Sequence, residues 1–322
     1  MKICYSLWLI LGCAVLALAG CSAPQNPNGV VSIIPAQAIL LHAMASSSPT
    51  IRSAAVESAG QLDPTEAAVI VRQGLTDPSS AVKFTACIVA GKHRLQVLKP
   101  LLRQMVAHAS QRVLPGVIYA LARMGDTRHV SELAVLLENS DPVARANTAM
   151  VLGRLGDRSA IGLLRTDERE PIHAVRLAVT SALARLGYPR AVSSLIALSY
   201  SRYAEDHLAA LNTCRSLATP VAVNVLLAGL SDPLPAGRLI AARGLGQRGS
   251  RVGEKLARHY SRSADPNLRV LAALALGWIP DGANADRLEN MLQDPSQKVR
   301  IAAAAGLLHL YRLAKLAPAA PS

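Results

Sequence analysis

The stretch DPVARANTAMVLGRLGD, residues 141–157, shows how this chain is built. It opens with an aspartate and a proline, which suit the N-cap and the first position of an α-helix. Apolar side chains then recur at helical spacing as far as Leu155. Gly156 follows, and glycine most easily takes the left-handed conformation in which helices end. The stretch therefore predicts a helix from Arg145 to Leu155 between a turn and a stop signal.

The same pattern recurs along the chain every 31 residues. Steps of this length from Arg145 reach a basic residue at seven of nine positions, and the apolar column seven residues later contains no polar side chain. The nine positions are Arg52, Lys83, Leu114, Arg145, Arg176, His207, Arg238, Arg269 and Arg300. Such a period marks a repeat architecture, in which each unit buries its apolar face against its neighbours.

Turn and stop signals follow the same period. Aspartate-proline pairs, which we expect to cap the second helix of a repeat, begin at Asp77, Asp141, Asp232, Asp265 and Asp294. Glycines that we expect to end this helix are Gly125, Gly156, Gly187 and Gly249. The apolar run Glu132–Leu137 predicts the preceding helix. Each unit is therefore predicted to be helix, turn, helix.

This order of an Asp-Pro turn, an arginine, an alanine-rich helix and Leu-Gly resembles HEAT repeats, in the short bacterial form that also occurs in the phycobilin lyase HEAT-like family. The resemblance covers residues 35 to 313. It implies an all-α fold, a right-handed α-solenoid of the HEAT/armadillo type with about nine 31-residue helix-turn-helix repeats. Because packed helices lie about 8 to 10 Å apart, we expect a curved rod about 80 to 100 Å long with a concave binding surface.

The N-terminal residues are predicted to be a targeting signal. An apolar run from Leu7 to Leu18 follows Lys2 and is typical of a signal peptide, and it is too short to span a bilayer as a helix. The run ends in Leu18, Ala19, Gly20 and Cys21, which resembles the lipobox of bacterial lipoproteins. That resemblance implies that Cys21 becomes the lipidated first residue of the mature protein.

We expect four parts in the chain. They are the lipoprotein signal peptide at 1–20, the lipidated cysteine and a flexible tether at 21–33, the solenoid at 34–313, and a disordered tail rich in alanine and proline at 314–322. Several acyl chains on one residue anchor a protein stably. Ser22 after the cysteine resembles the outer-membrane sorting pattern, so we expect a lipid-anchored protein of the cell envelope, facing the periplasm if the host is diderm.

The chain is basic, with a formal net charge of +13. Removal of residues 1–20 takes away only Lys2 among the charged groups, which leaves 33 basic residues against 21 acidic ones and a net charge of +12. A summed positive field attracts anionic partners. The basic character therefore belongs to the repeat body.

Two columns of basic residues carry the candidate sites. The first is the origin column, with Arg52, Lys83, Arg145, Arg176, Arg238, Arg269 and Arg300. The HEAT resemblance implies that these side chains form a structural ladder with turn aspartates of the same or the neighbouring repeat. The alternative is a track for a polyanion, because the cations would recur about every 10 Å.

The second column lies nine residues after the origin and has no repeated acidic partner. It contains Lys92, Arg123, Arg154 and Arg185, and the columns near it contain Tyr119, Asn147, Met150, Asn212 and Arg243. One interpretation is a ligand-binding face. The other is a set of solvated helix ends whose arginines favour the C-terminal helix dipole.

Motifs for catalysis, cofactors or metals are weak. The segment Gly244–Gly249 matches the dinucleotide fingerprint in its letters, but it closes a helix where that loop must open one. His129 and Glu132 lack a third metal ligand nearby. Cys87 and Cys214 are expected to be buried thiols about 40 Å apart, too far for a disulfide. We therefore predict no enzyme activity, no cofactor and no metal.

The sequence favours a protein-protein interaction scaffold that holds an unidentified partner on its concave face. The alternative is a basic module that binds a polyanion such as a cell-wall polymer, lipopolysaccharide or nucleic acid. A lyase-type enzyme, or its chaperone subunit, is a third hypothesis that rests on fold analogy.

Overall fold

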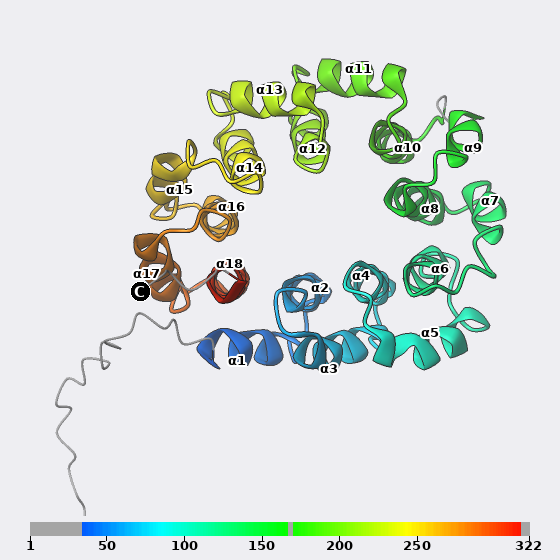
Figure 1. The fold of residues 1–322 in the computed structure, drawn as a ribbon, viewed down its shortest axis with the longest axis horizontal. Helices are drawn as coiled ribbons and strands as arrows, with labels where there is room; N and C mark the ends of the chain where they lie inside the picture. Colours follow the sequence, from blue (N-terminus) through cyan, green and yellow to red (C-terminus); the bar gives the residue numbers. More distant parts are fainter. Residues whose placement is uncertain (1–33, 167–169, 317–322) are drawn as a thin grey trace, which may run out of the picture. The chain divides into compact units, whose positions relative to one another are not determined.

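The computed structural model describes residues 34–166 and 170–316, all of which belong to one compact unit (Figure 1). These residues form α-helices and one short 3-10 helix, and none of them lies in a strand, so the expected all-α class is confirmed. The signal peptide, Cys21 and the tether lie outside the described residues. The last helix ends at Leu316, so the start of the expected tail at 314 is too early, and residues 317–322 lie outside the described residues.

The elements divide into an outer and an inner layer of helices. In chain order they are α1 (Ile34–Ala43), α2 (Pro49–Ala59), α3 (Pro64–Leu75), α4 (Ser80–Lys92), η1 (Gln96–Leu98), α5 (Lys99–Val106), α6 (Leu114–Arg123), α7 (Glu132–Leu137), α8 (Pro142–Leu155), α9 (Ala160–Thr166), α10 (His173–Arg185), α11 (Pro189–Leu198), α12 (Ala204–Cys214), α13 (Pro220–Gly229), α14 (Pro235–Gly246), α15 (Glu254–Tyr260), α16 (Pro266–Leu276), α17 (Gly282–Met291) and α18 (Gln297–Leu316). The even-numbered helices line the inside, and the odd-numbered helices lie outside them (Figure 1). The described residues thus form nine helix pairs, which confirms the repeat number.

The predicted N-caps of the inner helices are partly confirmed. Asp141 and Asp265 are N-caps, and their carboxylates accept hydrogen bonds from the backbone N–H two residues later at 3.0 and 2.8 Å. The prediction is wrong for Asp77, Asp232 and Asp294, because the helix after each of them begins three residues later. Each of these three carboxylates accepts a hydrogen bond from a backbone N–H of the turn and faces a side chain of the preceding repeat, which is Arg52, His207 or Arg269.

The predicted glycine stops are confirmed. Gly125, Gly156, Gly187 and Gly249 have φ angles of +83°, +79°, +78° and +80°. An L-residue with a side chain rarely adopts this backbone conformation. Each of these glycines therefore lets the chain leave an inner helix and turn toward the next outer one.

Small side chains bring the inner helices close together. A Cβ atom added to Gly153 of α8 would lie 2.7 Å from the Cα atom of Ala182 in α10, which leaves no room for a side chain. Ser181 of α10 and Thr213 of α12 also meet closely, since their hydroxyls are 3.0 Å apart. Successive inner helices therefore pack directly against each other.

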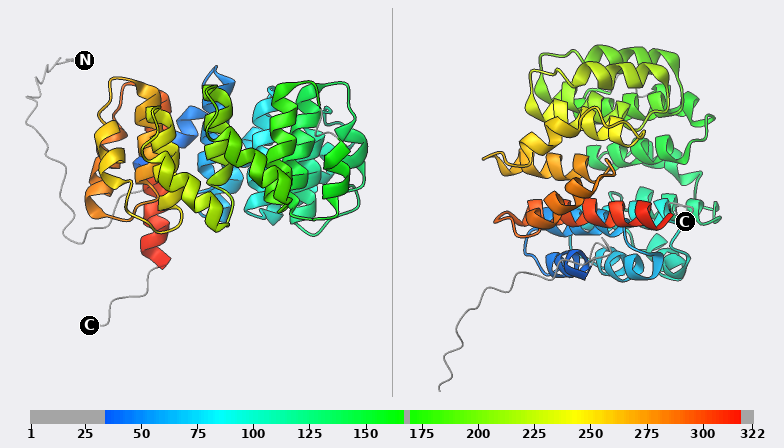
Figure 2. Two further views of the ribbon diagram at one scale, coloured as in Figure 1. Left: turned by 90° about the horizontal axis from the view of Figure 1, so that it is seen from above. Right: turned by 60° about the vertical axis from the view of Figure 1, so that its left-hand side comes forward.

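The repeat body closes on itself. Helix α18 packs against α16 and α17 and also against α1 and α2 (Figure 2). One continuous apolar core includes side chains from the first and the last helices of the body. Gln61 Oε1 and His309 Nδ1 are 3.0 Å apart, and Arg312 donates a longer contact of 3.5 Å to the carbonyl of Gly60. Every residue from 301 to 310 is buried.

The expected curved rod is therefore wrong, because the described body is a closed ring (Figure 1). The physical reason lies in the two end helices. An open solenoid needs terminal repeats with a polar outer face, but α18 carries the run IAAAAGLLHL over residues 301–310. Contact with α1 and α2 buries that face, and the surface expected to be concave becomes the ring interior.

Closure places two histidines in apolar surroundings near positive charges. Burial, followed by the charges of Arg312, Lys92 and Arg243, lowers the pKa of His309 to about 4. Burial, followed by Lys92 and Arg312, lowers the pKa of His93 to about 4. The His309 ring also lies 3.7 Å from the Trp278 ring, centroid to centroid. Both histidines are neutral in the folded ring at neutral pH.

We expect the free energy of unfolding to fall as the pH decreases from about 6.5 to 4, because only the unfolded chain then binds protons at these histidines. Each histidine contributes at most about 1.4 kcal/mol per pH unit. Urea denaturation across this pH range measures the slope. The double variant His93→Gln, His309→Gln should flatten it, and an unchanged slope in that variant would contradict this assignment.

Candidate functional site

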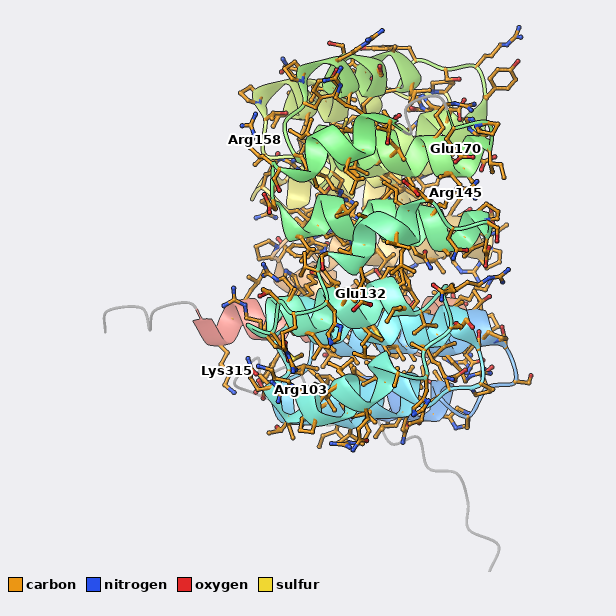
Figure 3. All side chains as sticks on the ribbon, turned by 90° about the vertical axis from the view of Figure 1, so that its right-hand side faces the viewer. Arg103, Glu132, Arg145, Arg158, Glu170 and Lys315 are labelled. Atoms are coloured by element: carbon orange, nitrogen blue, oxygen red, sulfur yellow. The ribbon has the colours of Figure 1, made fainter. Side chains whose placement is uncertain are left out.

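Three rungs of the origin column join neighbouring repeats. In each, the guanidinium donates two hydrogen bonds of 2.6 to 2.9 Å to a carboxylate that lies 25 residues later. The pairs are Arg52 with Asp77, Arg145 with Glu170, and Arg269 with Asp294. Figure 3 shows Arg145 beside Glu170 of the next repeat. The hydrogen bonds from the arginines hold the pKa of each carboxyl below its usual range.

The remaining members of this column have other partners. Arg176 and Arg300 donate to carbonyl groups of the preceding turn, and Arg238 donates to the Asp232 carbonyl and the Tyr260 hydroxyl. The positive charge of Lys83 acts on Asp77 without a hydrogen bond between them. Two further pairs, His207 with Asp232 and Arg112 with Asp141, also link neighbouring repeats. The column therefore joins neighbouring repeats at some positions and holds the turn of its own repeat at others.

The second column behaves differently. Lys92, Arg123, Arg154 and Arg185 lie in the last turns of α4, α6, α8 and α10, four successive inner helices. Within residues 34–166 and 170–316, none of their side chains has a hydrogen bond or ion pair, and the Nε atoms of Arg123 and Arg154 are buried without a partner.

Two arginines from α12 and α14 complete this group. Arg215 follows the last residue of α12, and Arg243 lies in the last turn of α14 with a buried Nε atom that also lacks a partner. Together these residues form the interior cluster, which consists of Lys92, Arg123, Arg154, Arg185, Arg215 and Arg243. These residues lie in or directly after six inner helices (Figure 1), and the charges of Arg154, Arg185, Arg215 and Arg243 act on other members of the cluster.

The cations of the interior cluster act on one another across the ring. Burial, followed by the charge of Arg154, lowers the pKa of Lys92, and the charges of Arg243 and Arg215 add to this effect. Burial is also the largest cause that lowers the pKa of Arg185 and of Arg215 to about 10. Since α4 and α14 lie on different sides of the ring, this coupling runs through the interior (Figure 1).

Negative charge in the described part of the interior is sparse. Glu57 of α2 raises the pKa of Lys92, Arg215 and Arg243 and so opposes the shifts that burial causes. Its carboxylate forms no ion pair with any of these residues among the salt bridges of the described chain. The interior therefore combines a positive potential with guanidinium donors that lack an acceptor, which is the chemistry of an anion-binding site.

The other residues of the candidate binding face are divided. Asn212 is exposed and accepts a 3.1 Å hydrogen bond from Arg215, so it adjoins the cluster. Tyr119 is 4% exposed and packs against Gly91, and Met150 is half-buried beside the apolar core. Asn147 donates to the carbonyl of Arg112 at 2.8 Å. The structure therefore brings Asn212 and Arg243 to the cluster. Tyr119 packs in the core and also raises the pKa of Arg185, whereas Asn147 is bonded to the backbone of Arg112 and Met150 packs beside the core.

Sequence reasoning missed Arg215 and Glu57. Arg215 lies 30 residues after Arg185, one residue short of the 31-residue step, so it does not fall in the second column. Glu57 stands in the same column as Arg243, six periods earlier, and that shared column was the signal that could have found it.

The structure also places the histidine, glutamate and cysteine residues of the weaker sequence motifs. His129 Nδ1 and Glu132 lie 2.6 Å apart on the surface, and no group of three or more His, Cys, Asp or Glu in the described residues is arranged to hold a metal ion. Cys87 and Cys214 are buried and unpaired, and burial raises the pKa of their thiols to about 12 and about 11. No helix in the described ranges is long and apolar enough to cross a membrane.

The family follows from the repeats themselves. A model of HEAT repeats matches residues 37–121, 98–167, 130–213 and 223–308, which together are more than half of the chain. The chain belongs to the HEAT-repeat family. This HEAT-repeat protein has no match among the curated proteins compared with it.

Solved structures with similar helical arrays include several proteins. Human deoxyhypusine hydroxylase in complex with glycerol is 19% identical over 82% of this chain and 98% of that one, with a TM-score of 0.39. The CpcE–CpcF complex of phycocyanin lyase from Nostoc sp. PCC7120 is 19% identical over 77% and 95%, with a TM-score of 0.40. Kap121p bound to Pho4p is 14% identical over 85% of this chain and 37% of that chain, with a TM-score of 0.37.

One fold supports many functions, so the HEAT-repeat array does not decide by itself what this protein does. The arrangement of side chains within this HEAT-repeat protein has to carry the functional argument.

We predict that Arg269→Met lowers the free energy of unfolding by about 3 kcal/mol, because it leaves the Asp294 carboxylate, 10% exposed, without its cation. The matched control is Arg300→Met, which removes hydrogen bonds to two carbonyl groups but leaves the Arg269–Asp294 pair intact. Its cost should be about 1 kcal/mol. Equal losses in urea denaturation of the two variants would contradict a structural role for the rung.

Removal of an interior cation should not lower the free energy of unfolding. We expect Arg154→Gln to leave the free energy of unfolding unchanged or to raise it by about 0.5 to 1 kcal/mol, because a partly buried charge without a partner and beside other cations is removed. The same urea titration measures this. A loss as large as that of Arg269→Met would show that Arg154 is needed for the fold.

Proposed function

We propose that this protein is a lipid-anchored interaction scaffold of the bacterial cell envelope, whose ring interior binds an acidic segment of a partner protein. The observation that carries this proposal is the interior cluster, in which three arginines have buried Nε atoms without an acceptor. Cations that a fold needs for itself are paired, as the rungs of the origin column are. Unpaired cations that lie near one another cost stability, so their presence favours a role in binding.

The partner class follows from the chemistry of the groups that converge. Guanidinium and ammonium groups hold carboxylates or phosphates, and they supply no nucleophile of their own. HEAT-type arrays present extended surfaces to partner chains. We therefore favour a protein ligand and a binding role over catalysis. A non-protein polyanion is the second candidate, because the body as a whole carries a net charge of +12 without residues 1–20.

The proposed location in the cell rests on the sequence alone. The lipobox resemblance at Leu18, Ala19, Gly20 and Cys21 supports a lipid anchor, and Ser22 supports outer-membrane sorting in a diderm host. A short tether between Cys21 and α1 would keep the ring close to the bilayer. A partner in or near the same membrane could then reach the interior.

The test is a pulldown from gently solubilised membranes with the tagged full chain. We expect the wild type to capture a protein that is lost when Lys92, Arg123, Arg154 and Arg185 are all changed to Glu. The Cys21→Ala variant should leave the membrane fraction while its interior stays intact. Mass spectrometry of the eluates identifies the captured protein.

A matched control carries the same charge change on the outside. Arg72, Arg158, Arg190 and Lys255 are exposed and make no hydrogen bond or ion pair through their side chains within the described ranges. Their change to Glu should leave capture intact. Equal loss in both variants would reduce the effect to net charge and favour the polyanion candidate, and capture that survives the interior variant would refute the proposed binding surface.

A further inference from the structure

A pocket adjoins one side of the interior cluster. It lies between α12, α14 and α16, on the inner layer, and has a volume of about 340 Å³. Four aliphatic side chains and two guanidinium groups of its lining matter for the argument: Leu208, Leu239, Ile240, Leu271, Arg215 and Arg243. This size falls in the range of pockets that hold small groups.

The pocket has two chemically different sides. Leu239 is fully buried, whereas Leu208, Ile240 and Leu271 are half-buried and leave apolar surface open to the interior. Apolar surface at a concave site gains free energy when a ligand covers it. This side alone would accept an aliphatic group.

The cationic side has spare donors. Arg215 donates to Asn212 at 3.1 Å and to Gln247 at 3.2 Å, so its neighbours are uncharged amides. Arg243 makes no side-chain hydrogen bond in the described chain, and its Nε atom is buried. Glu57 acts on both arginines from a distance, without an ion pair. An anion at this edge would meet two guanidinium groups and no carboxylate in contact with them.

We propose that this pocket binds an aliphatic side chain of the partner's acidic segment, with the carboxylate next to that side chain held by Arg215 and Arg243. The proposal rests on the proposed function, since it assumes that an acidic segment enters the ring. It adds a sequence preference to that function. A simple anion would use the arginines and leave the apolar side empty, so the two sides together select an aliphatic residue beside an acidic one.

The experiment uses fluorescein-labelled peptides and the full chain in detergent, with binding read as fluorescence anisotropy. The first peptide alternates aspartate and leucine, the second replaces each leucine with serine, and the third replaces each aspartate with asparagine. We expect the first peptide to bind at least about tenfold more tightly than either of the others, because it alone uses both sides of the pocket.

Variants of the pocket locate the effect. Ile240→Ser should weaken the aspartate-leucine peptide by about tenfold and leave the aspartate-serine peptide unchanged. Arg243→Gln should weaken both acidic peptides. The matched control is Arg190→Gln, an exposed cation of an outer helix outside the pocket lining, which should leave the binding of both acidic peptides and the preference for leucine over serine intact. Circular dichroism of each variant checks that the helices persist.

The outcomes separate this inference from the proposed function. Equal binding of the two acidic peptides, or no effect of Ile240→Ser on their ratio, would overturn the pocket while an acidic partner in the ring could stand. If no peptide binds, and if the pulldown loses the partner only when the outer cations are reversed, both the pocket and the binding of an acidic partner in the ring are overturned. Octanoate that binds when the peptides do not would show that the pocket takes a free aliphatic acid and would overturn a partner segment as its occupant.

Discussion

The contact of α18 with α1 and α2 is the constraint on which the rest of this structure depends. It buries the apolar run at 301–310 and joins the first and last helices in one core. Without it, both end helices would expose apolar faces to water, a condition that solenoids avoid with polar terminal repeats. Closure therefore takes the place of capping. It also makes the inner layer of helices the inside of a ring, where an open array would present a concave surface (Figure 1).

Enclosure changes the energetics of the inner cations. On an open face, the arginines at the ends of the inner helices would be solvated and helped by the helix dipoles. In the ring, burial and mutual repulsion lower the pKa of Lys92, Arg185 and Arg215. Arg52, Arg145 and Arg269 of the origin column stay paired with carboxylates of the next repeat. One fold thus carries one set of cations that stabilises its repeats and another set that an anion would stabilise.

Much of this fold could be predicted from the period. The 31-residue step locates the inner helices, and the glycine stops have the expected left-handed backbone. Closure was missed because a period describes contacts between neighbours and says nothing about the ends, although the lack of a polar face at 301–310 was a readable signal. The site was half found. Arg215 was missed because it lies one residue before the position that the 31-residue step predicts. The pairing of Arg145 with Glu170 was missed because only turn aspartates were expected.

The most direct measurement of ring closure is the distance between the first and last repeats in solution. Thr50 and Lys298 are exposed in the first turns of α2 and α18, so nitroxide labels can be attached there through a non-canonical amino acid, with the native cysteines unchanged. Because neighbouring helices lie about 8 to 10 Å apart, closure predicts one narrow distance below about 25 Å in pulsed electron resonance. A distance above about 60 Å, as expected for an open array of stacked repeats, would contradict the ring and the enclosed cationic interior with it.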